Sequence, residues 1–330
     1  MVSINKSLEE KMKVVTVIIP FYNEEGGLQD FYDGLIETLD SLPTYNFEML
    51  FVNDGSSDKG LELIDALSRR DQRVSYIDLS RNYGKEVAMT AGFDYAKGDA
   101  VVVIDADLQQ PPAVIKEMLH YWEQGFDDVY AIRKERLGES RSKIWFSKTY
   151  YRIIGKMTQE KVYPNAGDFR LLDRKVVNAL ASMREQARYT KGLYGWVGFK
   201  KKAISYIAQP RKSGITKWSF SKLLKLAVNG LTAYTTVPLR ISTYMGVLVS
   251  FFGFIYMLIV LIQKIFGLGD VSGYASLMIG ILLLGGVQLI SLGVIGEYLA
   301  RVFVESKQRP LYFIENYHTH DETQKRVKKV

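Results

Sequence analysis

The chain has 330 residues, no cysteine, three histidines and a formal net charge of +7. The lack of cysteine excludes disulfide bonds, thiolate metal sites and cysteine catalysis, and so few histidines disfavour a histidine-based zinc site. Twelve lysines and arginines, with no acidic residue, lie between Gln186 and Gly269. This basic block predicts a polyanionic neighbour, either nucleic acid or an anionic membrane surface.

The N-terminal part of the chain alternates between short β-prone runs and amphipathic helical patterns. We expect strands at 14–21, 47–53, 74–79, 100–105 and 128–132, and helices at 26–41, 85–97 and 111–124, with a further helix that ends at 70 and follows N-cap residues at 54–58. This alternation predicts an α/β fold with a mostly parallel, Rossmann-like sheet. No glycine-rich or Walker loop follows a strand, which argues against dinucleotide-binding and P-loop proteins.

Two carboxylates follow the apolar run at 100–104. Asp105 and Asp107 lie one residue apart, Gln109 comes next, and the prolines at 111 and 112 suit the first turn of a helix. The carboxyl ends of strands in such a sheet are where ligands bind. Hard oxygen ligands so placed suit Mg²⁺ or Mn²⁺ bridging to phosphate oxygens, the alternative being a solvated turn.

Two apolar runs near the C-terminal end are each long enough to cross a membrane. They extend from Ile241 to Ile262 and from Ala275 to Ala300, and their short join predicts a helical hairpin. The alternative is a pair of buried helices in a soluble protein. Basic residues flank the outer ends of the hairpin, so the positive-inside rule places both termini and the N-terminal domain in the cytoplasm.

The segments next to this hairpin also carry predictions. Residues 216–234 have the pattern of a basic amphipathic helix in the membrane interface, so an anionic membrane surface, and not nucleic acid, is the expected partner. The small residues Gly286, Gly293 and Ala300 recur every seven positions and favour close helix packing, within the hairpin or in a homo-oligomer. The β-prone run 309–314 is expected to fold back as an edge strand, on the catalytic domain or on a neighbouring subunit, and 321–330 to be disordered.

These features divide the chain into four parts. We expect a catalytic domain at 1–210, a basic interfacial segment at 211–238, two membrane helices within 239–301 and a cytoplasmic tail at 302–330.

Several spaced motifs together resemble one enzyme family. They are Ile-Pro-Phe-Tyr-Asn-Glu at 19–24, Val-Asn-Asp-Gly-Ser at 52–56, Asp-Ala-Asp-Leu-Gln-Gln-Pro-Pro at 105–112, Asp-Phe-Arg-Leu-Leu at 168–172 and Arg-Lys-Ser-Gly at 211–214 followed by Lys217. With the hairpin, they resemble the polyisoprenyl-phosphate glycosyltransferases, which include dolichol-phosphate mannose synthase-like enzymes and bactoprenol glucosyltransferases. The resemblance implies an inverting enzyme with the GT-A fold.

The resemblance also implies roles for individual residues. Nucleotide binding would fall to Pro20, Tyr22, Glu24 and Asp54, with Asp105 also on the donor. A divalent metal, Mg²⁺ or Mn²⁺, would be held by Asp105, Asp107 and Gln109. The lipid phosphate would meet Arg133 and Arg211, helped by Arg141, Arg170 and Lys217, although a solvated surface is the alternative for the outlying arginines. The catalytic group would comprise Asp105, Asp107, Asp168, Arg133 and Arg211.

The reaction expected from this resemblance is the transfer of one sugar from a nucleotide diphosphate sugar to polyprenyl phosphate. UDP-glucose is the first choice of donor, and UDP-aminoarabinose and GDP-mannose are the alternatives. A lipid phosphate is already an oxyanion, so no strong base is required. We therefore expect Asp168, in a loop before a helix, to orient Arg170 or to contact sugar or phosphate. Two alternative functions are that of a nucleotidyltransferase and that of a membrane-tethered binding or scaffold module.

Overall fold

The computed structural model describes residues 12–134, 166–186, 188–208, 236–266 and 273–320. It separates into two compact units. Within the described ranges, the first unit comprises 12–134, 166–208 and 310–320, and the second comprises 236–309. The predicted amphipathic helix at 216–234 lies outside the described residues.

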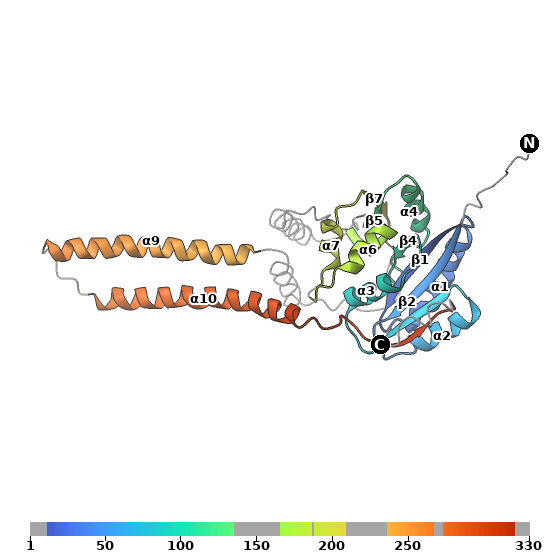
Figure 1. Cartoon of the computed structure of the whole chain (residues 1–330), viewed down its shortest axis with the longest axis horizontal. Helices are drawn as coiled ribbons and strands as arrows, with labels where there is room; N and C mark the ends of the chain where they lie inside the picture. The colour runs from blue at the N-terminus through green and yellow to red at the C-terminus, as the bar shows by residue number, and fades with distance from the viewer. Residues whose placement is uncertain (1–11, 135–165, 187, 209–235, 267–272, 321–330) are drawn as a thin grey trace, which may run out of the picture. The chain divides into compact units, whose positions relative to one another are not determined.

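The first unit is built on one mixed sheet (Figure 1). In the described part of the chain its strands are β1 (Lys13–Phe21), β2 (Tyr45–Asn53), β3 (Val74–Leu79), β4 (Ala100–Val103), β5 (Asp128–Arg133), β6 (Ala166–Asp173), β7 (Lys201–Tyr206) and β8 (Ile314–His318). Their order is β7-β5-β6-β4-β1-β2-β3-β8. Parallel pairing joins β4, β1, β2 and β3, and also β5 and β7, whereas β6 and β8 run antiparallel to their neighbours. The predicted mostly parallel α/β sheet is confirmed.

Helices cover both faces of this sheet because its strands are apolar on both sides. In β4, Ala100 and Val102 face α1 (Glu25–Asp40), α2 (Gly60–Arg70) and α4 (Val114–Glu123). The alternate residues Val101 and Val103 face α3 (Lys85–Tyr95), α6 (Arg174–Ser182) and α7 (Thr190–Trp196). The result is a three-layer α/β/α arrangement with a core on each side of the sheet.

The direction in which the chain crosses the sheet changes between β1 and β4. From β1 the chain steps to β2 and β3 on one side, and α3 then returns it to β4 on the other side of β1. In open α/β sheets, ligands bind outside the carboxyl ends of the strands at such a switch point. The residues that follow β1 and β4, at 22–25 and 104–107, therefore occupy the position expected for a site.

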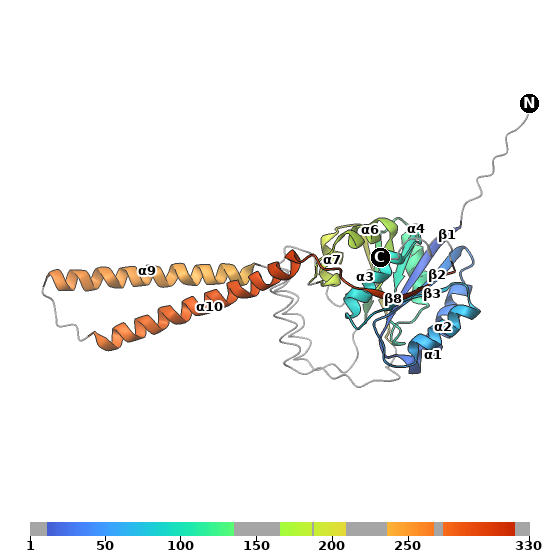
Figure 2. The same ribbon diagram turned by 60° about the horizontal axis from the view of Figure 1, so that its bottom comes forward.

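The tail returns to the first unit, as predicted, but the strand lies further along the chain. The edge strand is Ile314–His318, not 309–314, and it pairs antiparallel with β3 (Figure 2). The residues before it are also attached, because Phe313 accepts a hydrogen bond from the Ser80 amide and the Tyr312 hydroxyl donates to Asp94 at 2.6 Å. Tyr95 packs edge-on against Tyr317.

The second unit contains two long helices, α9 (Val237–Ile265) and α10 (Tyr274–Ser306), which run side by side (Figures 1 and 2). Both are long and apolar enough to cross a membrane, and no part of the most apolar window of either helix is buried. Helices of a soluble core would bury these side chains, so their exposure favours the predicted hairpin over that alternative.

Two local expectations were wrong. Asp168 lies inside β6 and not in a loop, because β6 pairs with β4 and β5 on both sides. Helix α4 begins at Val114, after the two prolines, and Pro111 and Pro112 form the preceding turn, where their carbonyls accept from the amides of Val114 and Ile115.

Candidate functional site

The acidic end of β4 is held in place by Gln110. The side-chain oxygen of Gln110 accepts from the Asp105 amide at 2.9 Å, and its Nε2 donates to Asp105 Oδ2 at 2.8 Å. Two residues after Asp105, Asp107 Oδ1 accepts from the Gln109 amide at 3.1 Å. Leu108 between them has φ 61°, a left-handed conformation that turns the chain sharply. The Asp105 carboxylate thus has a fixed orientation.

Lys85, in the first turn of α3, bridges two acids of this edge. Its Nζ lies 2.6 Å from Asp105 Oδ1 and 2.9 Å from Asp168 Oδ2. Asp105 follows β4 and Asp168 lies on the adjacent β6, so strand pairing brings these acids together. The structure therefore brings Asp105 and Asp168 together, with a cation between them.

The surroundings of the two acids shift their pKa values in opposite directions. Burial alone would raise the pKa of Asp168, but Lys85, with Lys191 and Arg170, outweighs it and holds the pKa below its ordinary value. For Asp105, burial together with the neighbouring Asp168 and Asp107 outweighs Lys85 and raises the pKa. Asp168 therefore stays ionised near neutral pH and is a weak base.

The backbone in front of Lys85 is fixed by Asp54. The Asp54 carboxylate accepts hydrogen bonds from the Tyr83 amide at 2.7 Å and from the Gly84 amide at 2.9 Å. Its side chain is buried, and burial raises its pKa although these amides oppose the shift. Asp54 was expected to contact the nucleotide, but the structure engages it with the loop that presents Lys85.

Gly55 allows this loop to approach closely. It has φ +65°, and a Cβ there would lie 2.4 Å from the Arg81 carbonyl carbon and 2.5 Å from the Asn82 nitrogen. Only glycine combines that conformation with so close a contact.

The loops after β1 and β2 are tied to each other. The Asn23 amide donates to Ser56 Oγ at 3.0 Å, and Asn23 Oδ1 accepts from the Ser57 amide at 2.8 Å. Further along, the Glu25 amide donates to Asp58 and the Lys59 amide donates to Glu25. Reciprocal bonds of this kind give a rigid rim at the switch point.

The other residues expected on the donor have different surroundings. Tyr22 is exposed (47%) on this rim and Glu24 directly precedes α1, so both remain near the expected site. Pro20 is buried within β1, where it pairs in register with Val52. Its side chain therefore packs inside the sheet.

Arg133, the last residue of β5, places a guanidinium group at the carboxyl end of that strand. Its Nη2 is buried and has no hydrogen-bond partner among the described residues. Burial raises the pKa of Tyr206, the strand partner of Arg133, and the charges acting on that hydroxyl come from Arg133, Asp105, Asp107 and Lys85. The charges of Arg133 and of these acids thus all act on one tyrosine, and an anion would satisfy the unpaired guanidinium nitrogen.

Arg170 does not face an open acceptor site. Its Nη1 lies 3.0 Å from Asp128 Oδ2, both side chains are almost fully buried, and its guanidinium lies 3.4 Å from the centre of the Tyr194 ring. Lys201 also pairs with Asp128 at 2.9 Å. Arg170 was expected to contact phosphate or to be oriented by Asp168, but its ion pair is with Asp128. The other expected phosphate contacts, Arg141, Arg211 and Lys217, lie outside the described residues.

The acids fit a divalent ion only together with a ligand. Among the described residues, no group of three or more histidine, aspartate and glutamate side chains forms a metal-binding arrangement. Asp105 and Asp107 supply two carboxylates, and Asp168 Oδ1 is buried without a hydrogen-bond partner in the part of the chain that the structure describes. Mg²⁺ is commonly held by one or two carboxylates and completed by water and substrate phosphates. The donor set therefore fits Mg²⁺ or Mn²⁺ bound with a diphosphate.

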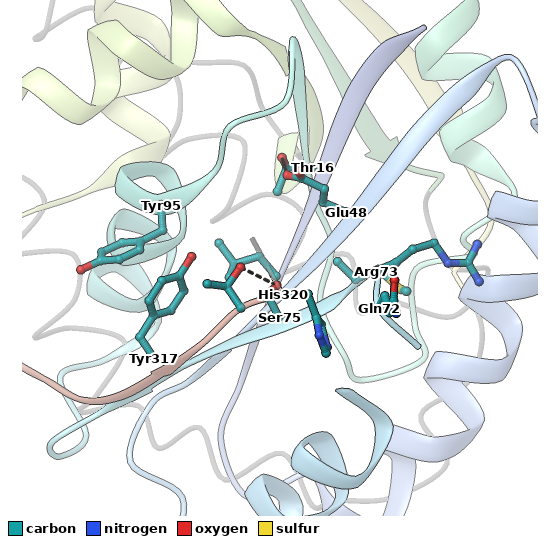
Figure 3. A pocket seen from close by; sticks show the side chains of 11 residues that line it. Thr16, Glu48, Gln72, Arg73, Ser75, Tyr95, Tyr317 and His320 are labelled. Atoms are coloured by element: carbon teal, nitrogen blue, oxygen red, sulfur yellow. Dashed lines mark hydrogen bonds between the residues drawn. The ribbon is translucent and has the colours of Figure 1, made fainter. Parts of the chain in front are cut away.

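A small cavity lies elsewhere on the first unit (Figure 3). It measures about 100 Å³, and its lining includes Thr16, Glu48 and Ser75 near the amino ends of their strands, with Tyr317 and His320 from the tail. Nucleotide-sized ligands require pockets of roughly 300 Å³ or more. This cavity is distant from the strand ends that carry the acids and is too small for such a donor.

Comparison with known proteins identifies the family. Residues 16–181 match the model of glycosyl transferase family 2. The chain belongs to this family. Residues 237–302 match a second model, described as the GtrB C-terminal hairpin. The predicted resemblance to polyisoprenyl-phosphate glycosyltransferases is confirmed.

Full-length relatives share both parts of this family 2 chain. An uncharacterized glycosyltransferase of Synechocystis is 46% identical, with 92% of this chain and 95% of the relative covered. The bactoprenol glucosyl transferase of Shigella phage SfV is 40% identical, with 92% and 98% covered. A solved structure, glucosyl-3-phosphoglycerate synthase from Mycobacterium tuberculosis with Mn²⁺, UDP and phosphoglyceric acid, aligns with a TM-score of 0.48 at 16% identity, covering 66% of this chain and 75% of that one.

Lys85 and Gln110 were missed by the sequence analysis. Gln110 lies inside the motif at 105–112, but it is adjacent to Gln109 and of the same residue type, so the sequence does not show which of the two holds Asp105. Lys85 begins a predicted helix, but only strand pairing shows that it meets acids 20 and 83 positions away.

Proposed function

We propose that this glycosyltransferase transfers a single sugar from a nucleotide diphosphate sugar to polyprenyl phosphate, with inversion at the anomeric carbon. UDP-glucose is the proposed donor. The observation that carries the proposal is the acidic edge that follows β4 at the switch point of the sheet, together with a buried guanidinium nitrogen of Arg133, unpaired among the described residues, at the carboxyl end of β5 two strands away. A metal-bound diphosphate and an acceptor phosphate both need such an arrangement, and the relatives named bactoprenol glucosyl transferase support the lipid acceptor.

Asp105, Asp107 and Gln109 would hold Mg²⁺ or Mn²⁺ in this scheme. The ion would neutralise charge on the leaving nucleoside diphosphate. Gln110 contributes by fixing the Asp105 carboxylate before the donor arrives. Tyr22 and Glu24 on the rim are the proposed contacts for the nucleoside, and Asp54 acts indirectly through the loop at 83–85.

The acceptor phosphate supplies its own nucleophile. A phosphomonoester has a second pKa of about 6, so an oxyanion is present at neutral pH and the protein mainly has to align it. Arg133 would hold this phosphate through a charge-assisted hydrogen bond. Arg141, Arg211 and Lys217 remain predicted helpers. Asp168, with its lowered pKa and its ion pair to Lys85, would position groups without taking a proton.

The exposed apolar surfaces of α9 and α10 support a membrane location. A polyprenyl chain is confined to the bilayer, so an enzyme that spans the bilayer meets its acceptor there. The basic residues at the outer ends of the hairpin favour a cytoplasmic active site.

The test is a donor screen with purified full-length protein in detergent. Undecaprenyl phosphate, Mg²⁺ or Mn²⁺ and one radiolabelled nucleotide sugar at a time are supplied, with the double variant Asp105→Ala/Asp107→Ala as control. Label that enters the organic phase with UDP-glucose, and is lost in the control, supports the proposal. Label from UDP-aminoarabinose or GDP-mannose alone would change the donor. No lipid-linked label with any donor, despite nucleotide binding, would favour a different acceptor or a binding module.

A further inference from the structure

The ammonium group of Lys85 occupies a place between acids where a divalent ion would also be bound. It contacts Asp105 at 2.6 Å and Asp168 at 2.9 Å, and Asp107 is two residues beyond Asp105. Without a nearby cation, these carboxylates would repel one another at a partly buried strand edge. Lys85 supplies that cation from the protein itself.

The backbone around Lys85 is held more tightly than its side chain. Asp54 binds the amides of Tyr83 and Gly84, and Gly55 packs against the same loop. The Lys85 side chain is nevertheless 42% exposed, whereas that of Asp168 is only 10% exposed. Rotation of this flexible, partly exposed side chain can therefore move the ammonium off the acids, while the loop and the acids stay in place.

We propose that Lys85 is a removable counter-ion: it neutralises Asp105 and Asp168 while no metal is bound, and it is displaced when a divalent ion enters with the donor. This inference rests on the proposed metal-dependent function and adds a positioning residue to it. The displaced ammonium remains next to the diphosphate, where its positive charge attracts the phosphate oxygens. The bridge lowers the affinity for metal alone, so that metal is retained mainly when donor phosphates arrive with it.

The experiment measures Mn²⁺ affinity directly, from the electron paramagnetic resonance signal of free Mn²⁺, with full-length protein in detergent and no donor. Lys85→Met removes the charge and keeps the chain length, and Lys85→Arg keeps the charge. Lys116→Met, on the exposed face of α4, is the matched control for loss of one positive charge. Thermal melting with and without Mn²⁺ is recorded for each protein.

We expect Lys85→Met to bind Mn²⁺ about tenfold more tightly or better, since the competing cation at a contact of 2.6 Å is gone. Its metal-free form should melt lower than wild type, and Mn²⁺ should raise its melting temperature more. Lys85→Arg and Lys116→Met should keep wild-type affinity. A merely structural lysine would not tighten metal binding when removed.

Equal or weaker Mn²⁺ binding by Lys85→Met overturns the inference and leaves the donor reaction standing. If neither wild type nor Lys85→Met binds Mn²⁺, the inference falls together with metal dependence, and the donor screen reports separately whether sugar transfer occurs. Should Lys85→Met fail to fold, Lys85→Gln gives the same comparison, because its amide can donate a hydrogen bond without carrying charge.

Discussion

The Gln110 side chain forms two hydrogen bonds with Asp105: it accepts from the Asp105 amide at 2.9 Å and donates to the Asp105 carboxylate at 2.8 Å. Partners behind a metal-binding carboxylate set its orientation, and their loss commonly costs about 10- to 100-fold in activity or metal affinity. We expect Gln110→Glu to lower kcat/KM by a factor in this range, because a second carboxylate would repel Asp105 and could not donate to it.

Steady-state kinetics with the donor found in the screen measure this effect. Gln124→Glu, the same change at the exposed end of α4, should leave the rate unchanged. Wild-type kinetics for Gln110→Glu would show that the hydrogen bonds between Gln110 and Asp105 have no part in the reaction.

We expect replacement of glycine by alanine to have opposite effects on stability at Gly55 and at Gly34. Gly55→Ala would place a Cβ 2.4 Å from backbone at a φ of +65°, so we expect a loss of about 1–3 kcal/mol in stability and a displaced Lys85 loop. Gly34→Ala, in the middle of α1 with no atom within 4 Å of the new Cβ, should be neutral or stabilising by up to about 1 kcal/mol. Thermal melting compares them directly, and equal melting temperatures would contradict the close approach at Gly55.

Local patterns were sufficient to predict strands β1 to β5 but not the pairing of the antiparallel strands β6 and β8. Val74–Leu79 was predicted with the observed bounds because its apolar run and flanking polar residues are all local signals. The reversed direction of β6 and the position of β8 depend on which distant strand each one meets, namely β4 and β3. Periodicity carries no information about such partners.

The same limit applies to the site. Asp105 and Asp107 were recognisable because the signal is a short motif at a strand end. Arg170 and Asp54 also lie in motifs of the family. In the structure, however, Arg170 forms an ion pair with Asp128, and Asp54 accepts hydrogen bonds from the loop at 83–84. A sequence shows that a charged residue is present, but only the fold shows what neutralises it.

The buried pair of Arg170 and Asp128 predicts unequal costs for its two members. Asp128→Leu leaves both Arg170 and Lys201 without their anion, so we expect a loss of about 3–5 kcal/mol. Arg170→Met should cost less, because Lys201 still neutralises Asp128. Melting temperatures test this order. An Arg170→Met protein of unchanged stability with a raised KM for polyprenyl phosphate would instead restore the role in phosphate binding.

The hydrogen bond from Tyr312 to Asp94 anchors the tail, and Arg184 holds the same carboxylate. We expect Tyr312→Phe to lower stability by about 1–2 kcal/mol and to expose 310–320 to limited proteolysis. Tyr83→Phe, which removes a tyrosine hydroxyl bonded only at the surface to Ser80, is the control. Unchanged proteolysis of Tyr312→Phe would show that β8 alone holds the tail.

The same hydroxyl predicts a dependence on alkaline pH. Burial first, and then Asp94, raises the pKa of Tyr312 above its usual value of about 10. A raised folded-state pKa means that the contribution to stability is complete below pH 10 and declines as the pH rises above it. The difference in melting temperature between wild type and Tyr312→Phe should therefore be constant from pH 7 to about 9 and shrink at higher pH. A difference that grows above pH 10 would contradict this assignment.

Asp168 provides the sharpest test of how the acceptor is activated. A general base contributes about 10²- to 10⁴-fold, and its pKa is normally close to the working pH. The pKa of Asp168 is lowered, and its Oδ2 is occupied by Lys85 at 2.9 Å, so we expect Asp168→Asn to reduce kcat by less than about tenfold. Donor binding, measured in parallel by calorimetry, should be nearly unchanged, because the proposed metal ligands Asp105, Asp107 and Gln109 are left intact. A loss of several orders of magnitude in kcat with intact donor binding would make Asp168 a base, and the acceptor phosphate would then not react as a preformed oxyanion.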